Sequence, residues 1–485
     1  MFRLTIAQLR ASVRRFIAPG IAIIIGTAFV TITLISGSVM TQVTEDNAAG
    51  LGDAASTAYT VFVLVFALIA MLVAALVIAN TFQVLIAGRM KLVALQRCIG
   101  VTTGQVYRSV IAEAAALGAA ASALGILLGL ALSQMGLSIL SARYSTVIFP
   151  ASIPVSLVAI LGPLVFGTLV TVLASLRPAR AATRVSPIAA LRPADMPAES
   201  KRENLLRMTF SVIFTVAGFA VAAWAVWTAS PDHAGTMSEE TVILAAALGI
   251  AVSFIGMVVT ATYWLAPLAS VTSRLFGRVT PTAHLAAMNI RRNPRRTAAT
   301  ATAMLIGVTL VITVATAATS ARRTLDERIA AMGDVDPAVV SSIETFINTA
   351  LAVIIALLAV SLVIAVVGVA NTLSLSVVER RKENATLRAI GLTRGRLRGM
   401  LALEGAFIAL IGAACGVLLG VLYGFIGADV ILGHGGAESN SVILAVPWGY
   451  IVASILIAIL AGLLASVLPA MSAAKATPVE ALAAE

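Results

Sequence analysis

The chain has 485 residues, of which 60% are hydrophobic and 11% are charged, and it carries a net charge of +11. A soluble chain of this length would carry roughly twice that charged fraction, because charged side chains cover a water-exposed surface. The composition therefore excludes a soluble enzyme or a soluble nucleic-acid-binding protein and indicates a polytopic membrane protein. The two cysteines form no disulfide framework and no Cys/His cluster has metal-ligand spacing, so we expect no metal site.

Ten apolar stretches reach the length of about 20 residues that a helix needs to cross a bilayer. In chain order they are 17–40, 57–87, 110–137, 153–176, 208–229, 241–272, 298–320, 346–378, 400–428 and 447–468. The expected fold is therefore an all-α polytopic membrane protein with about ten transmembrane helices. Several stretches exceed 25 residues, which indicates tilt or helices that continue beyond the bilayer.

The distribution of basic residues predicts the orientation of these spans. With the N-terminus inside, the outer segments contain only four of the 33 Lys and Arg residues but 13 acidic residues. Because Lys and Arg concentrate in cytoplasmic loops, we expect both termini in the cytoplasm. The positive net charge is then explained by topology in a lipid bilayer, and we expect no nucleic-acid partner.

The sequence is duplicated over a long distance. The tripeptide ANT at 79–81 recurs at 370–372, an offset of 291 residues, and the same offset aligns charged and glycine residues further on. The aligned pairs include Arg89 with Arg380, Lys91 with Lys382, Arg97 with Arg388, Gly100 with Gly391, and Glu113 with Glu404. The start of each copy aligns at an offset of 281, where Arg10 matches Arg291. Chance similarity between apolar helices would not align these residue types, so we infer an internal duplication.

Each copy contains four spans, so the two copies have the same orientation and a pseudo-twofold axis along the membrane normal should relate them. Spans five and six have no counterpart and form an inserted hairpin. The expected domains are a first repeat at 1–191, a cytoplasmic linker at 192–206, the hairpin at 207–280 and a second repeat at 281–485.

A short charged segment joins the second span to the third in each copy. Gly100 and Gly391 stand where a helix would end in a left-handed residue, and Thr102 and Thr393 follow as N-cap candidates. Thr102 with Gln105 also makes a capping box. We therefore expect a short helix at the inner membrane surface, followed by a sharp turn back into the bilayer.

The basic residues of these segments have two interpretations. They either anchor the loop to lipid headgroups or face a docked partner, and the doubling of both spacing and turn favours docking. Glu113 and Glu404 are expected about one turn inside the third and ninth spans, where a carboxylate interacts with the helix N-terminus and with nearby arginines. The alternative for these two acids is proton coupling or substrate contact.

Three motifs together resemble the FtsX-like permease family, the membrane subunits of MacB-type (type VII) ABC transporters. They are MNIRRNPRRT at 288–297, ERRKENATLRAIGLTRG at 379–395 and LPAMSAAKATPVEAL at 468–482. The ten-span form with two four-helix FtsX-like repeats is similar to permeases of antimicrobial-peptide and multidrug exporters. Family members usually carry a large extracellular domain between the first two spans of a copy. Here those loops have about 16 and 25 residues, so we expect no periplasmic adaptor.

The resemblance implies that 89–100 and 380–391 are coupling helices that dock on two copies of a separate ABC ATPase. The residues assigned to this contact are Arg89, Lys91, Arg97, Gly100, Arg380, Lys382, Arg388 and Gly391. The chain has no G-x-x-x-x-G-K-[ST] phosphate-binding loop, so we expect it to be no enzyme and to hold no cofactor. ATP and Mg²⁺ would be bound by the partner ATPase.

We therefore expect the permease subunit of an ATP-driven exporter in the bacterial inner membrane. Because the midplane of the spans is nearly free of charge, the expected cargo is hydrophobic or amphipathic: a drug, a lipid or a peptide. The alternatives are a non-transporting sensor or regulatory scaffold that works with an ATPase, and a secondary transporter. We expect the substrate path between the two copies, although its bulky candidate residues would also suit simple packing. These candidates are Phe29, Phe62, Phe66, Met71, Phe82 and Phe346.

Overall fold

The computed structural model describes most of the chain. The described residues are 13–46, 75, 98, 100–143, 150–184, 201–230, 233, 237–276, 280–292, 294–332, 366, 381–433 and 442–475. Within these ranges, eight helices are long and apolar enough to cross a membrane, and each overlaps one of the predicted spans. The all-α polytopic fold is thus confirmed, while the predicted spans 57–87 and 346–378 lie outside the described residues.

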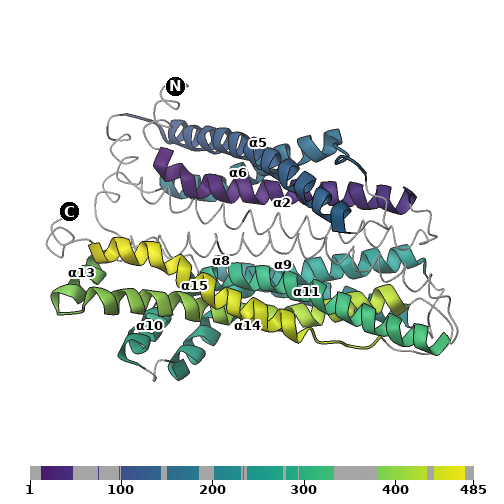
Figure 1. The fold of residues 1–485 in the computed structure, drawn as a ribbon. Coiled ribbons are helices and arrows are strands. Elements are labelled where there is room, and N and C mark those ends of the chain that lie inside the picture. Colours follow the sequence, from purple (N-terminus) through teal and green to yellow (C-terminus); the bar gives the residue numbers. More distant parts are fainter. Residues whose placement is uncertain are drawn as a thin grey trace. The chain divides into compact units, whose positions relative to one another are not determined.

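The chain forms two compact units. The first holds residues 1–50 and 66–204, and the second holds 51–65 and 205–485. In the first unit, three long helices pack on one another (Figure 1): α2 (Val13–Asp46), α5 (Thr103–Arg143) and α6 (Leu157–Arg184). The predicted domain boundaries and the pseudo-twofold axis stay predictions.

The second unit is built around α11 and α14, which pack closely along their length. Its helices are α8 (Lys201–Ala229), α9 (Glu239–Phe276), α10 (Pro281–Arg292), α11 (Pro294–Met332), α13 (Arg381–Ala389), α14 (Arg394–Gly433) and α15 (Trp448–Lys475). α15 packs on α14, and α9 packs on both α11 and α14. The two helices that sequence analysis assigned to an inserted hairpin, α8 and α9, thus lie in the same unit as the second repeat.

The two units contain the same glycine-mediated helix crossing. A Cβ at Gly125 of α5 would lie 2.6 Å from the carbonyl oxygen of Ile24 in α2, and a Cβ at Gly416 of α14 would lie 2.8 Å from that of Leu305 in α11. The glycines are 291 residues apart and the carbonyls 281, which are the two offsets of the sequence duplication. Small residues let helix backbones approach closely where no water drives association. The duplication is therefore present in the packing as well as in the sequence.

The α8–α9 hairpin makes a specific contact with α14. The hydroxyl of Ser253 in α9 donates a hydrogen bond to the hydroxyl of Tyr423 at 3.1 Å, and both groups are buried. The ring of Tyr423 also stacks on Phe219 at 5.7 Å and meets the edge of Phe254 at 6.1 Å. The residue that aligns with Tyr423 in the first copy is Leu132, which has no hydroxyl. This contact therefore distinguishes the second copy from the first.

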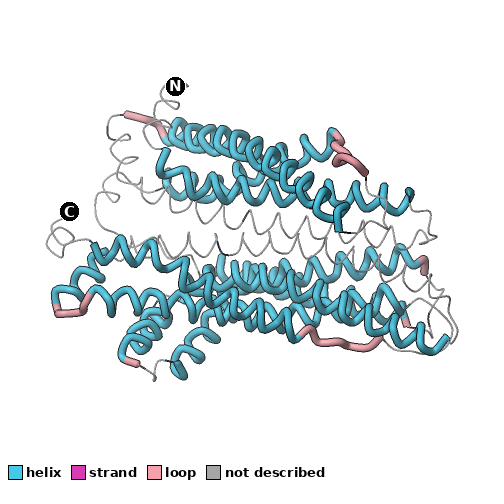
Figure 2. Tube along the Cα trace, in the orientation of Figure 1, coloured by secondary structure: helices cyan, strands magenta, loops and turns pink. Residues whose placement is uncertain are grey.

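An extended segment, 442–447, lies along the C-terminal half of α11 and leads into α15 (Figure 2). The backbone N–H groups of Ile443 and Ala445 donate hydrogen bonds of 3.1 Å to the hydroxyls of Thr324 and Ser320. These side chains satisfy backbone groups that no helix or strand partner satisfies. They also fix the start of α15 against α11.

The glycine crossing predicts opposite effects for two alanine substitutions in α14. A Cβ at Gly420 would lie 2.6 Å from the Cβ of Ile312, whereas a Cβ at Gly427 meets nothing within 4 Å. Gly420→Ala should destabilise the fold by about 1–3 kcal/mol through overpacking. Gly427→Ala should stabilise it by up to about 1 kcal/mol, because alanine favours the helix. Thermal unfolding in detergent measures both, and equal shifts for the two variants would contradict the assigned packing.

Candidate functional site

Half of the residues expected to contact an ATPase lie within the described part of the chain. Lys382 and Arg388 lie in α13, a helix of nine residues that corresponds to the predicted coupling helix 380–391. Gly391 lies in the turn that follows α13, and Gly100 lies in the corresponding turn of the first copy. The others, which are Arg89, Lys91, Arg97 and Arg380, lie outside the described residues. The end of this helix and the turn after it are thus confirmed in the second copy, while the length of the helix and the ATPase contact stay predictions.

The turn after α13 has the geometry that its glycine predicted. Gly391 has a φ of 105°, and its N–H donates to the carbonyl of Arg388 at 3.1 Å. The N–H of Leu392 donates to the carbonyl of Leu387 at 3.0 Å. These two bonds make a Schellman motif, which ends the helix and satisfies its last carbonyls. Gly100 has a matching φ of 100° in the first copy.

Both predicted N-caps are also present. In the first copy the N–H of Thr102 donates to Oε1 of Gln105 at 3.1 Å, and the N–H of Gln105 donates to Oγ1 of Thr102 at 3.4 Å. In the second copy Oγ1 of Thr393 accepts from the N–H of Arg396 at 3.4 Å. These contacts satisfy free N–H groups at the starts of α5 and α14. A left-handed glycine followed two residues later by a threonine N-cap therefore occurs in both copies.

A small apolar core lies under the turn of the second copy. It contains the buried residues Ala286 of α10 and Leu397, Met400 and Leu401 of α14. Leu387 and Leu392, on either side of the turn, pack against it, which is the apolar contact that accompanies a Schellman motif. The amphipathic helix α10 thus shares one core with α13 and the start of α14.

The outer surface of the same turn carries an exposed apolar side chain. Ile390 is 79% exposed, at the tip between α13 and Gly391. Arg394, Arg396 and Arg398 at the start of α14 are also exposed. Sequence analysis did not single out Ile390. The sequence contained a sign of its exposure, because Leu387 and Leu392 already fill the apolar positions that the turn buries, which leaves Ile390 on the outside.

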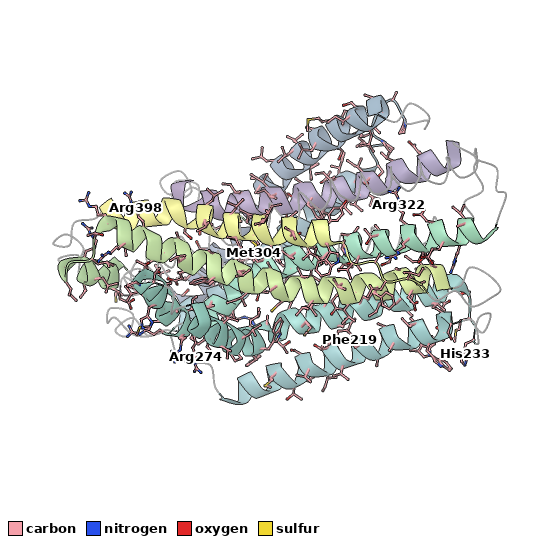
Figure 3. All side chains as sticks on the ribbon, turned by 60° about the horizontal axis from the view of Figure 1, so that its bottom comes forward. Phe219, His233, Arg274, Met304, Arg322 and Arg398 are labelled. Atoms are coloured by element: carbon pink, nitrogen blue, oxygen red, sulfur yellow. The ribbon has the colours of Figure 1, made fainter. Side chains whose placement is uncertain are left out.

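Basic side chains lie at both ends of the second unit, as the side-chain view shows. Arg398 and Arg274 lie toward one end, and Arg322 and His233 lie toward the other (Figure 3). The α13 turn lies at the end that holds Arg398, because Arg398 lies in the first turns of α14. An exposed isoleucine flanked by arginines is suited to a protein surface with an apolar pocket and an acidic rim.

The two acids occupy different positions from those expected. Because α5 begins at Thr103 and α14 at Arg394, Glu113 and Glu404 lie ten residues into their helices and not within one turn. The field of a helix terminus acts mainly over the first turn, so the expected contact with the helix N-terminus was wrong. Glu113 is 6% exposed and Glu404 is 1% exposed.

One partner of Glu404 is a side-chain amide. Nδ2 of Asn289 in α10 donates a hydrogen bond to Oε2 of Glu404 at 3.2 Å. Nδ2 of Asn289 also lies 3.9 Å from the sulfur of Met400. Sequence analysis missed Asn289, although the offset of 281 aligns it with another amide, Gln8.

The chain matches the FtsX-like permease C-terminal family twice, over residues 64–187 and 355–478. The two matches begin 291 residues apart, as the duplication requires, and together they cover about half of the chain. The chain belongs to the FtsX-like permease family. The helices α5, α6, α14 and α15 and the two turns fall within the matched residues.

This FtsX-like permease is similar over part of its length to several curated proteins. It is 31% identical over 133 residues to the uncharacterized ABC transporter permease MJ1507 of Methanocaldococcus jannaschii, covering 27% of this chain and 32% of that protein. It is 32% identical over 123 residues to the uncharacterized ABC transporter permease YknZ of Bacillus subtilis, covering 25% and 29%. It is 33% identical over 144 residues to the macrolide export ATP-binding/permease protein MacB of Shewanella oneidensis, covering 30% and 21%. The matched regions thus span about a third or less of each relative.

The expected substrate path is not assembled by the described residues. Phe29 is fully buried in α2, so it packs inside the protein in this conformation. The other five candidates, which are Phe62, Phe66, Met71, Phe82 and Phe346, lie outside the described residues. A path between the copies stays a prediction.

The described residues contain no group of three His, Cys, Asp or Glu side chains that could hold a metal ion.

The left-handed turn predicts a local effect of substituting its glycine. Gly391→Ala places an L residue at positive φ, at a cost of about 1–2 kcal/mol. We expect faster amide hydrogen exchange across 387–394 with little change in the unfolding temperature, because the strain is confined to the turn. Gly395→Ala is the matched control, since a Cβ there meets nothing within 4 Å and Gly395 lies inside α14. Equal exchange in the two variants would contradict the role of Gly391.

Proposed function

We propose that this FtsX-like permease is the membrane subunit of an ATP-driven ABC exporter, in the bacterial inner membrane with both termini in the cytoplasm. The observation that carries the proposal is the doubled turn. Gly100 with Thr102 and Gly391 with Thr393 place a left-handed glycine and an N-cap at the same spacing in both copies. Two such turns in one chain suit the two clefts of an ATPase dimer, so one permease chain would bind two ATPase subunits.

The contact with the ATPase would use the exposed side of the turn. Ile390 is the apolar side chain that a partner pocket would enclose, and Arg388 in the last turn of α13 adds positive charge beside it. Well-packed apolar anchors with nearby arginines are the groups that dominate protein interfaces. ATP and Mg²⁺ would be held by the partner, and this chain would respond to ATP only through its two turns. The names of MJ1507 and YknZ as ABC transporter permeases support such a partner.

The proposed cargo is hydrophobic or amphipathic and moves outward. In the described spans, hydroxyls such as those of Thr27, Thr31 and Thr309 donate to carbonyls of their own helices. They therefore offer a cargo few free polar groups, and shape would provide the selectivity. MacB is named for macrolide export, which supports the outward direction and a drug-like cargo.

Two further expectations belong to this proposal. The domain limits would be 1–191, 192–206, 207–280 and 281–485, with the hairpin as an accessory to the second repeat. No periplasmic adaptor would be needed, because the outer segment between the first two spans of each copy is short.

The proposal predicts the composition of the complex. Native mass spectrometry of the complex purified from membranes should show one permease chain with two ATPase chains, because each ATPase cleft takes one of the two turns. A control with Ile390→Asp should lose one ATPase chain from the complex, since a carboxylate would replace the apolar anchor. A core with two permease chains and two ATPase chains would contradict the proposal.

A further inference from the structure

The helix α10 shares a core with the α13 turn and leads along the chain into the membrane-spanning helix α11. It ends at Arg292, two residues before Pro294, the first residue of α11, and proline favours the first position of a helix. Across this corner, Oγ1 of Thr297 in α11 donates a hydrogen bond to the carbonyl of Ile290 in α10 at 3.4 Å. Both residues are buried. The chain and this hydrogen bond therefore connect α10 directly to the start of α11.

A polar contact holds α10 on α14 among apolar side chains. Asn289 in α10 donates to Glu404 in α14 at 3.2 Å, next to the core that Ala286, Met400 and Leu401 form. Apolar packing alone is non-directional and permits sliding, whereas a hydrogen bond fixes one register. The pair is costly to bury, and apolar residues of similar size would pack there without that cost. Packing alone therefore does not explain the pair.

The sequence places a similar pair in the first copy. The offset of 291 aligns Glu404 with Glu113, and the offset of 281 aligns Asn289 with Gln8, which also carries a side-chain amide. Glu113 is buried like Glu404. Gln8 lies outside the described residues, so its contact with Glu113 is an expectation from the duplication. An amide and an acid thus occur at equivalent positions in both copies.

We propose that Asn289 and Glu404 are positioning residues that transmit displacement of the α13 turn to α11. The inference rests on the proposed function, in which an ATPase moves α13. Leu387 and Leu392 would press on the core shared with α10. The Asn289–Glu404 hydrogen bond then prevents α10 from sliding along α14. A movement of α10 therefore displaces α11 through the corner at Pro294.

The test follows α11 in the intact complex and requires no known cargo. A single reporter cysteine, introduced as Asp326→Cys at the exposed C-terminal part of α11, is used in a Cys98→Ser background, because Cys98 is exposed and Cys415 is buried. The rate of maleimide labelling is measured without nucleotide and with ATP plus vanadate. ATPase association and ATP hydrolysis are measured on the same samples.

The variants separate positioning from a purely structural role. We expect Asn289→Leu, alone and with Glu404→Leu, to reduce the nucleotide-dependent labelling change by about 2- to 30-fold, while ATPase association and hydrolysis persist. Glu404→Gln keeps an acceptor for Asn289 and should retain the change. His284→Leu, on the exposed face of α10, is the matched control and should also retain it.

The outcomes are distinguishable. A wild-type labelling change in the Asn289→Leu/Glu404→Leu variant would overturn the positioning role, since packing alone would then suffice. The absence of any labelling change in the unsubstituted complex would also overturn it, because α11 would not move. Failure of the unsubstituted chain to bind an ATPase would overturn the proposed function, and the positioning role with it.

Discussion

A left-handed backbone conformation at Gly391 sets the direction in which the chain leaves α13 and enters α14. Because the turn reverses the chain within a few residues, Leu387 and Leu392 reach the same apolar core. That core also receives the apolar face of α10, which continues through a corner into α11. The exposed tip at Ile390 and the buried start of a membrane-spanning helix are thus parts of one packed structure.

The two copies share the left-handed glycine and the N-cap of the turn, at Gly100 with Thr102 and at Gly391 with Thr393. The crossings at Gly125 and Gly416 follow the offsets of the duplication, so the helix pairs α2–α5 and α11–α14 are built alike. Tyr423 binds the α8–α9 hairpin through Ser253, whereas Leu132 at the aligned position has no hydroxyl to do so. The α8–α9 hairpin therefore packs on α14 through a polar contact whose tyrosine the first copy lacks. The second copy is also secured by the segment 442–447 along α11.

Local features were predictable from the sequence, and long-range contacts were not. The left-handed glycine at 391 and the caps at Thr102 and Thr393 depend on residues within five positions of one another, and all were confirmed. The start of α14 at Arg394 agrees with the predicted cap at Thr393, but Glu404 was placed relative to the apolar span that begins at residue 400. Because polar helical turns precede that span, Glu404 was put too near a helix terminus. Its bond to Asn289, 115 residues away, depends on how α10 packs, which no local pattern reports.

The central claim is that the α13 turn is the surface on which an ATPase docks. A photo-crosslinking residue placed at Ile390 in native membranes tests it directly, with Leu464, an exposed residue of α15, as the control position. The account predicts that position 390, and not 464, captures a chain that contains a G-x-x-x-x-G-K-[ST] phosphate-binding loop. Capture of lipid alone at both positions would contradict it.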